Sequence, residues 1–195
     1  SGQRTTNTWD DQNRQTRVLL PAGGIVTSAY RFDGLRREKA DSESVTKYIW
    51  DFQNYLAETD AADTIQAVFT NEPQRYGNLI SQYREGPTIW VPSYYQYDAL
   101  GSARVLTDEG GNAADTYLYD AWGNELEVSG SAVNPFRWVG KIGHYWDEST
   151  GTFYIRARVY EPVIGRWMSQ YPLLYLVDFG ASYGLWLGGV LSTDP

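Results

Sequence analysis

Residues Tyr95–Asn124 read "YQYDALGSARVLTDEGGNAADTYLYDAWGN" and contain one signature twice. The seven residues "YQYDALG" at Tyr95–Gly101 return as "YLYDAWG" at Tyr117–Gly123. Alternate residues of a β-strand point to opposite faces, so the two tyrosines of each copy share one face and the residue between them lies on the other. Each copy therefore predicts a strand with an aromatic face, followed by a turn.

The aspartate of each copy, Asp98 or Asp120, is expected to end its strand. Its short carboxylate can accept backbone N–H groups two residues further on, as in an Asx-type turn. Gly101 and Gly123 then supply the positive φ that such a turn requires. Two strands, this turn and a second turn such as "DEGGN" at Asp108–Asn112 occupy roughly 20 residues.

The same unit recurs along the chain. Its aspartates stand at positions 10, 33, 51, 98, 120 and 147, separated by 23, 18, 47, 22 and 27 residues. One gap is about twice the others, so we expect a degenerate copy near "VFTNEPQRYGNLI" (68–80). The stretch "SVTKYIWDFQNYLAET" (44–59) fits the repeat as strands despite its helix-like charge pattern. The aromatic side chains are expected to stack from hairpin to hairpin, so that each repeat buries its aromatic face against its neighbours.

Composition points to the same fold. The 195 residues include 8 Trp, 16 Tyr and 19 Gly but one Met, which is typical of strands and turns. We predict an all-β fold: one continuous array of β-hairpins in a spiralling antiparallel sheet that forms part of a shell or tube. The net charge of −8, without a basic patch, argues against a nucleic-acid partner. The lack of cysteine excludes disulfides, a thiolate nucleophile and cysteine-ligated metal.

The segment Pro172–Leu191 is apolar and about long enough to cross a bilayer. Asp178 near its middle, its glycines and its lack of a basic flank favour a buried segment packed against the rest of the protein. We therefore predict no membrane span. The chain begins "SGQRTT", without an initiator Met or an apolar leader, so we expect a processed piece whose targeting information lies elsewhere.

The order of these motifs resembles that of RHS/YD-repeat proteins, and most closely their RHS repeat-associated core domain. The likeness extends over essentially the whole chain and is most specific over Tyr95–Pro172. Within it, "GTFYIRARVYEPVIGRW" (151–167) is similar to the family pattern G-x-Y-Y-x-R-A-R-Y-Y-x-P-x-x-G-R-F. The matched motif residues are Gly151, Tyr154, Arg156, Arg158, Gly165 and Arg166. The three arginines are expected to pair with acidic side chains on neighbouring strands or to stack on aromatic rings.

The resemblance implies a β-sheet that spirals into a hollow shell. In polymorphic toxins of this family the shell encloses a C-terminal effector, while related repeats in cell-wall proteins and teneurins serve contact and adhesion. The likeness divides the chain into YD-repeat hairpins (1–94), core hairpins (95–172) and a closing segment (173–195). It also implies a bacterial protein that is secreted or displayed on the cell surface, and neither cofactor nor metal is expected.

The resemblance further implies aspartyl self-cleavage, which needs two carboxyl groups that share a proton. Gly165 and Arg166 match the family motif, but Gln170 and Tyr171 stand where Arg-Asp is expected. The pKa of a tyrosine is near 10, so Tyr171 cannot replace an ionised carboxylate at neutral pH. The second motif, Asp194 before Pro195, is present. We therefore expect a chain that is not an enzyme, with Asp194 and Asp178 as the pair to consider for self-cleavage.

Other candidate residues are expected to be structural. The strand-end aspartates, including Asp33 and Asp51, suit turn capping better than acid–base chemistry. His144 is the sole histidine, so a packing or capping role is favoured over a metal site or a Ser–His dyad. The expected aromatic face consists of Tyr95, Tyr97, Tyr117, Tyr119, Trp146 and Tyr154.

Three functions remain open at this point. The first is a structural β-shell segment that encapsulates or displays a C-terminal effector. The second is a self-assembling extracellular fibre or adhesion protein, because a fragment of this length exposes edge strands through which copies can pair. The third is a core that cleaves its own chain.

Overall fold

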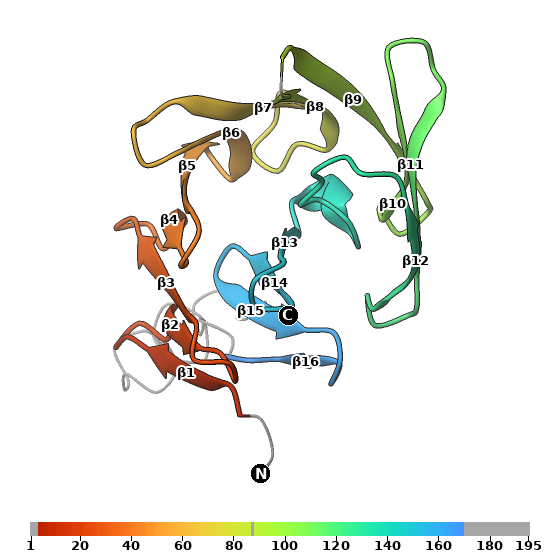
Figure 1. Ribbon diagram of the computed structural model, residues 1–195. Helices are drawn as coiled ribbons and strands as arrows, with labels where there is room; N and C mark the ends of the chain where they lie inside the picture. The colour runs from red at the N-terminus through yellow and green to blue at the C-terminus, as the bar shows by residue number, and fades with distance from the viewer. Residues whose placement is uncertain (1–3, 87, 170–195) are drawn as a thin grey trace, which may run out of the picture.

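The computed structural model describes residues 4–86 and 88–169 and builds them into two antiparallel β-sheets (Figure 1). The first sheet has twelve strands: β1 (Thr6–Trp9), β2 (Gln15–Leu19), β3 (Ile25–Tyr30), β4 (Arg36–Ala40), β5 (Val45–Asp51), β6 (Asn54–Thr59), β7 (Ile65–Asn71), β8 (Leu79–Glu85), β9 (Trp90–Tyr97), β10 (Ala103–Thr107), β11 (Ala113–Tyr119) and β12 (Glu125–Ser129). After the short 3₁₀ helix η1 (Gly140–Ile142), the second sheet has four: β13 (Tyr145–Asp147), β14 (Thr152–Ile155), β15 (Arg158–Glu161) and β16 (Arg166–Trp167). The predicted all-β fold with a long antiparallel array is confirmed.

The twelve strands follow one another in chain order, each paired with the next. The sheet curls into an open ring that runs from β1 through β5–β8 to β12, with β13–β16 inside it (Figure 1). Register shifts lie beside the turns, for example at Ala29/Tyr30 and at Leu118/Tyr119. Such irregularities bend a strand and increase its twist, so curvature is introduced hairpin by hairpin.

Side chains alternate across the sheet as the repeat predicts. In β11, Asp115, Tyr117 and Tyr119 are buried on the concave side, whereas Thr116 and Leu118 are exposed. The rings of Tyr117 and Tyr119 are parallel, with centroids 6.3 Å apart. The repeat tyrosines of this strand thus line the inside of the ring.

Seven turns in the described part of the chain share one five-residue frame, namely those that begin at Asp10, Leu20, Arg31, Asp60, Asp98, Asp108 and Asp120. In the turn that begins at Asp98, the Asp98 N–H donates to the Ser102 carbonyl and the Gly101 N–H donates back to the Asp98 carbonyl, each over 3.0 Å. The fourth residue has a positive φ in all seven turns: Asn13, Gly23, Gly34, Asp63, Gly101, Gly111 and Gly123. This frame explains why a small or amide-bearing residue follows the aspartate at a fixed offset.

Two copies of the repeat are placed differently from the prediction. In "YRFDGLRR" the first turn residue is Arg31, so Asp33 lies at the third turn position. Asp51 is the last residue of β5 and pairs with Asn54 across a two-residue turn in which Phe52 has a φ of 51°. Among the described residues, no hydrogen bond to the Asp51 side chain is present. From the spacing alone, all these aspartates were expected to end a strand and cap its turn, but the turns at Asp33 and Asp51 differ in the position of the aspartate or in length.

The degenerate copy and the 44–59 strands appear where they were expected. The stretch near 68–80 forms the end of β7, a loop and the start of β8, while β5 and β6 account for "SVTKYIWDFQNYLAET". The predicted boundary between residues 94 and 95 falls inside β9.

The prediction of one continuous array is wrong in one respect. After β12 the chain turns inward, and β13–β16 form a separate sheet within the ring (Figure 1). The aromatic face of the large sheet is therefore covered by this inner sheet as well as by neighbouring hairpins. A ring this wide leaves an interior that side chains of one layer cannot fill, so a second layer buries the aromatic surface.

In the described residues, no helix is long and apolar enough to cross a membrane. The predicted closing segment 173–195 and the apolar stretch Pro172–Leu191 lie outside the described part of the chain.

Candidate functional site

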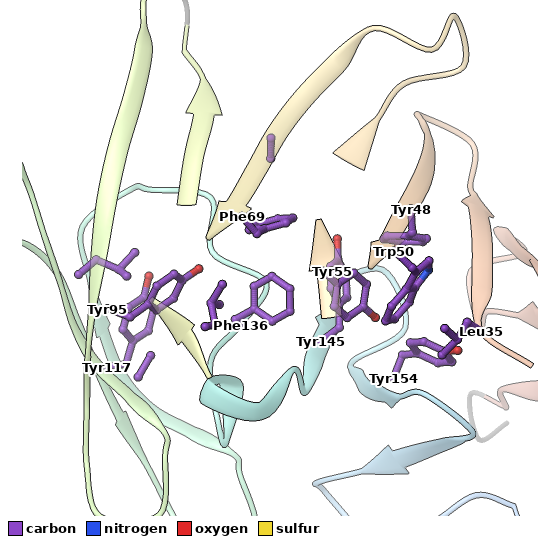
Figure 2. Close-up of a cluster of buried hydrophobic side chains, with 14 of the residues drawn as sticks. Leu35, Tyr48, Trp50, Tyr55, Phe69, Tyr95, Tyr117, Phe136, Tyr145 and Tyr154 are labelled. Atoms are coloured by element: carbon purple, nitrogen blue, oxygen red, sulfur yellow. The ribbon is translucent and has the colours of Figure 1, made fainter. Parts of the chain in front are cut away.

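The inner surface of the ring forms one aromatic cluster with the inner sheet (Figure 2). Phe136, in the segment that leads inward, lies at its centre. Its ring is 5.0 Å from that of Phe69, 5.2 Å from Tyr55 and 5.4 Å from Tyr145, with the planes at steep angles. Edge-to-face contacts of this kind are favourable beyond the burial of apolar area. The cluster therefore joins the middle of the large sheet to the start of the inner sheet.

Arg36 and Asp147 form a buried ion pair between the two sheets. The Arg36 guanidinium donates to both Asp147 oxygens, with Nη2 3.0 Å from Oδ1, and the side chains are 3% and 6% exposed. The Arg36 backbone N–H donates to the Tyr154 hydroxyl over 2.8 Å, and the Trp50 indole donates to the Arg36 carbonyl over 2.8 Å. Burial alone would lower the pKa of Arg36, but the charge of Asp147 raises it well above its usual value. Arg36 thus stays charged and ties β4 to β13 and β14.

Three rings surround the Arg36 guanidinium. Its central carbon lies 4.2 Å from the Tyr154 centroid, 4.8 Å from that of Tyr48 and 5.5 Å from that of Tyr145. The π faces of tyrosines attract a cation and compensate part of its lost hydration. Burial raises the pKa of Tyr145 well above its usual value, so the phenol keeps its proton and can donate it to an acceptor.

A second buried ion pair involves Glu58 of β6. It accepts hydrogen bonds from Arg84 Nη1 over 2.9 Å and from the Tyr145 hydroxyl over 2.8 Å. Here a buried carboxylate pairs with a half-buried arginine of the same sheet, and the hydroxyl of the inner-sheet Tyr145 also bonds to the carboxylate. The two clusters fix β13 against the wall at two places.

A hollow of about 500 Å³ opens beside these clusters. Its wall includes charged side chains of both signs: Lys39, Glu58, Arg84, Asp115, Arg137 and Glu148. Asp115 accepts the Ala132 N–H over 2.9 Å, and Arg137 pairs with Glu125 at 2.6 Å. Each of the lining charges thus has at least one partner in the protein, and the hollow resembles part of the wall of a lumen more than a ligand site.

The predicted tyrosines of the central repeats are buried or half-buried on the concave side. The Tyr95 hydroxyl lies 3.0 Å from Asn134 Oδ1 and 3.2 Å from Gln82 Oε1, and the Tyr97 hydroxyl donates to the Leu79 carbonyl over 3.0 Å. The Tyr95 and Tyr97 rings stack in parallel at 5.6 Å. These phenols therefore bond to groups of the protein itself.

Trp146 is placed differently from the predicted aromatic face. It alternates with the buried Tyr145 and Asp147 along β13 and therefore points to the opposite side of the inner sheet. There it packs on Phe153, with centroids 4.8 Å apart. The inner sheet thus has two aromatic faces, and Trp146 lies on the one opposite to Tyr145.

The repeat aspartates Asp98 and Asp120 contact their own turns. Asp98 Oδ1 accepts the N–H groups of Leu100 and Ser102 over 3.0 and 2.9 Å. Asp120 accepts those of Trp122 and Asn124 over 2.8 and 2.9 Å. Hydrogen bonds, first of all from the Asn124 side chain, lower the pKa of Asp120 below its usual value. These carboxylates are occupied by the backbone.

Replacing Asp98 with Ala should lower the free energy of unfolding by about 1–2 kcal/mol, because two backbone donors lose their acceptor. Asp51→Ala is the matched control, since no hydrogen bond to that carboxylate is present among residues 4–86 and 88–169, and we expect its effect to stay within about 0.5 kcal/mol. Urea denaturation followed by tryptophan fluorescence measures both. Equal losses in the two variants would contradict the capping role.

The motif glycines all have positive φ, and two of them lie against tryptophan rings. A Cβ on Gly123 would lie 2.7 Å from Trp138, and one on Gly165 would lie 3.1 Å from Trp122. A Cβ on Gly101 would lie 3.1 Å from Lys141, whereas Gly151 has open space around it. The glycines thus serve both the turn and the close packing of the inner sheet.

The motif arginines differ in their contacts. Arg156, at a positive φ of 52°, donates to the carbonyls of Gln53 and Ile142 over 3.0 and 2.8 Å and therefore joins the inner sheet to the β5–β6 turn. Arg158 stacks on Trp167 at 3.6 Å. Arg166 is exposed in β16, and its backbone pairs with Glu161.

His144 is half-buried, with its ring 5.6 Å from that of Trp138. Burial, with a smaller contribution from Arg156, lowers the pKa of His144 from 6.5 to about 4, so the ring is neutral at physiological pH. In the part of the chain that the structure describes, no group of three or more His, Asp or Glu side chains is arranged to hold a metal ion.

The candidate catalytic residues Asp178 and Asp194 lie outside the described residues, as does Tyr171. Self-cleavage through them stays a prediction. Conversely, the structure brings forward residues that the sequence did not single out: Arg36, Glu58, Arg84 and Phe136. The only signal in the sequence for Arg36 is its position directly after a YD-type turn, and Phe136 lies within Tyr95–Pro172, where the family likeness is most specific.

The family model described as Teneurin YD-shell matches residues 89–177. The tRNA3(Ser)-specific nuclease WapA of Bacillus spizizenii is 32% identical over 174 residues, which cover 86% of this chain and 7% of that protein. Toxin protein Tse5 of Pseudomonas aeruginosa is 33% identical over 185 residues, covering 77% of this chain and 14% of that protein. The chain therefore spans only a small part of the curated relatives it matches.

Among solved structures, the crystal structure of TcdB2-TccC3 superposes with a TM-score of 0.66 at 18% identity. The match covers 87% of this chain and 9% of that one, and at this identity it establishes the fold. A curled antiparallel sheet with an inner sheet defines a segment of a β-shell. The chain belongs to the RHS/YD-repeat proteins, in which it is a shell segment.

Proposed function

We propose that this segment forms part of a closed shell around an effector polypeptide, a toxin, that lies C-terminal to it in the full-length protein. The observation that carries the proposal is the attachment of β13–β16 to the inside of the wall by the buried Arg36–Asp147 ion pair and by the hydrogen bond from the Tyr145 hydroxyl to Glu58. The inner sheet β13–β16, attached in this way, fills the interior of the ring formed by the twelve-stranded sheet. The nuclease and toxin relatives support the proposal, because the matched part is only 7–14% of their length.

The role of the segment is mechanical in this proposal. Both buried acids, Asp147 and Glu58, are bound by arginines, and each also joins the two sheets, Asp147 through Arg36 and Glu58 through the Tyr145 hydroxyl. The repeat aspartates Asp98 and Asp120 are bound by their own turns. Chemistry on a target would belong to the enclosed effector. We also propose that the protein is secreted or displayed on the bacterial cell surface, in keeping with relatives named as toxins.

Limited proteolysis of the full-length protein tests this function. We expect the region after residue 195 to survive at least about tenfold longer in the intact protein than when produced alone, because an enclosed chain is inaccessible to protease. Asp147→Asn, which weakens the attachment of the inner sheet, should shorten this survival. Asp63→Asn, in an exposed ion pair, should leave it unchanged. Cleavage of the effector region at the same rate in the intact protein and alone would refute enclosure.

A further inference from the structure

The two rims of the curled sheet differ in chemistry. Because the strands form a simple meander, successive turns alternate between two rims. We call the rim formed by turns 10–14, 31–35, 52–53, 72–78, 98–102 and 120–124 the aromatic rim. The polar rim is formed by the turns at 20–24, 41–44, 60–64, between β8 and β9, and 108–112.

Five consecutive turns of the aromatic rim present a large apolar side chain to solvent. These are Phe32 (95% exposed), Phe52 (72%), Tyr76 (56%), Leu100 (76%) and Trp122 (60%). Only the first turn, 10–14, has a polar tip. On the polar rim the tips are small or acidic, such as Glu43, Asp63 and Glu109. Ile89 is the exception there among the described residues.

The apolar tips continue onto the inner sheet. Asn124 donates to the Pro162 carbonyl over 3.2 Å, and the Tyr160 hydroxyl donates to the Trp122 carbonyl over 3.0 Å. The exposed Val163 and Ile164 follow Pro162 directly and therefore lie beside this turn. The apolar surface thus widens at the Trp122 end of the rim.

The area is large for a free surface. Five such side chains at these exposures present roughly 700 Å². This approaches the ~800 Å² that each partner buries in a stable protein interface. Isolated apolar side chains on a surface need no explanation, but a row of them at five successive turns of the same rim does.

The spacing of the row points to its partner. Neighbouring strands are about 4.8 Å apart, so successive tips on one rim are about 10 Å apart. A partner with the same repeat, another run of YD hairpins, would meet these tips in register. The curled shape leads to the same partner, because the ring is nearly closed by β12 and β16 (Figure 1). Hairpins that precede β1 would collide with β12 and β16 if they continued the ring in the same plane. They must therefore be displaced along the ring axis, so that a rim of the preceding turn faces a rim of this one.

We propose that the aromatic rim is the surface on which the preceding turn of the same shell packs, while the polar rim faces solvent. This inference rests on the proposed function, since it takes the segment as one turn of a longer spiral. The relatives, of which this chain spans 7–14%, are long enough to supply that turn.

Thiol labelling tests the proposal, because this chain has no cysteine of its own. Leu100→Cys on the aromatic rim and Ala62→Cys on the polar rim occupy the same third position of identical turns, and both are exposed. Labelling rates are measured by peptide mass spectrometry in the 195-residue chain and in the full-length protein. In the short chain the two rates should agree within a few fold. In the full-length protein, labelling of Leu100→Cys should slow at least tenfold relative to Ala62→Cys.

A short cross-linker placed on the cysteine of Leu100→Cys then identifies what covers the rim. Cross-links to a hairpin turn upstream of residue 1 support the proposal. Cross-links to the effector region or to a second copy, or equal labelling of both rims in the full-length protein, overturn it. Since labelling reports on the rim alone, its failure would leave the protection of the effector from protease unaffected, and the two proposals fail separately.

Discussion

Asp147→Asn should destabilise the protein by about 3–5 kcal/mol, although the new side chain has almost the same shape. The change removes the charge that compensates Arg36 in a pocket where both side chains are nearly inaccessible. A buried charge without its partner carries its desolvation cost uncompensated. Lys39, whose Nζ is 3.4 Å from Asp147 Oδ1, increases the imbalance. Equilibrium unfolding in urea, followed by tryptophan fluorescence, measures the loss.

The exposed Lys47–Asp63 pair provides the matched control. It has an N–O distance of 2.6 Å, but Asp63 is 77% exposed. Asn tolerates the positive φ of this position, so Asp63→Asn should cost at most about 1 kcal/mol. The double variant Arg36→Met with Asp147→Leu removes both charges and should recover part of the loss, as is seen when buried ion pairs are replaced by apolar side chains. Similar losses for Asp147→Asn and Asp63→Asn would show that the buried pair does not hold the sheets together.

The large sheet was predictable because its information is local. A strand with tyrosines at alternate positions, an aspartate and a glycine three residues later define a hairpin without reference to the rest of the chain. The turn that begins at Asp98 illustrates this, since the backbone hydrogen bonds that close it and those that its Asp98 carboxylate accepts lie within five residues. After Asp51 the turn has two residues instead of five, and there the same aromatic–aspartate motif does not cap the turn.

The inner sheet was not predictable in the same way. Its strands have two to four residues, too few for a clear periodic pattern. Its position depends on contacts over long sequence distances, such as Arg36 with Asp147 and Glu58 with Tyr145, 111 and 87 residues apart. In one sequence a buried arginine cannot be told from an exposed one. Likewise, only the structure places Phe136 at the centre of the aromatic cluster.

Gly123→Ala should cost about 2–5 kcal/mol and shows how one motif residue serves both layers. At a φ of 93°, an L-residue costs about 1–2 kcal/mol more than glycine. The added Cβ would also lie 2.7–3.0 Å from three atoms of the Trp138 ring. That ring cannot move freely, because it stacks on Tyr160 with centroids 5.2 Å apart and packs on Phe153 at 5.6 Å. Overpacking of this kind adds about 1–3 kcal/mol.

Gly111→Ala separates the two contributions. Gly111 occupies the same fourth position of an identical turn, at a φ of 79°, but nothing lies within 4 Å of its would-be Cβ. This variant should therefore lose only the backbone contribution, about 1–2 kcal/mol. In the double variant Gly123→Ala with Trp138→Leu, the smaller leucine removes the clash. Relative to Trp138→Leu alone, the loss of unfolding free energy from Gly123→Ala should then approach that of Gly111→Ala. If both alanine variants unfold at the same urea concentration, Gly123 is needed by its turn alone, and the contact of that turn with Trp138 does not hold the inner sheet in place.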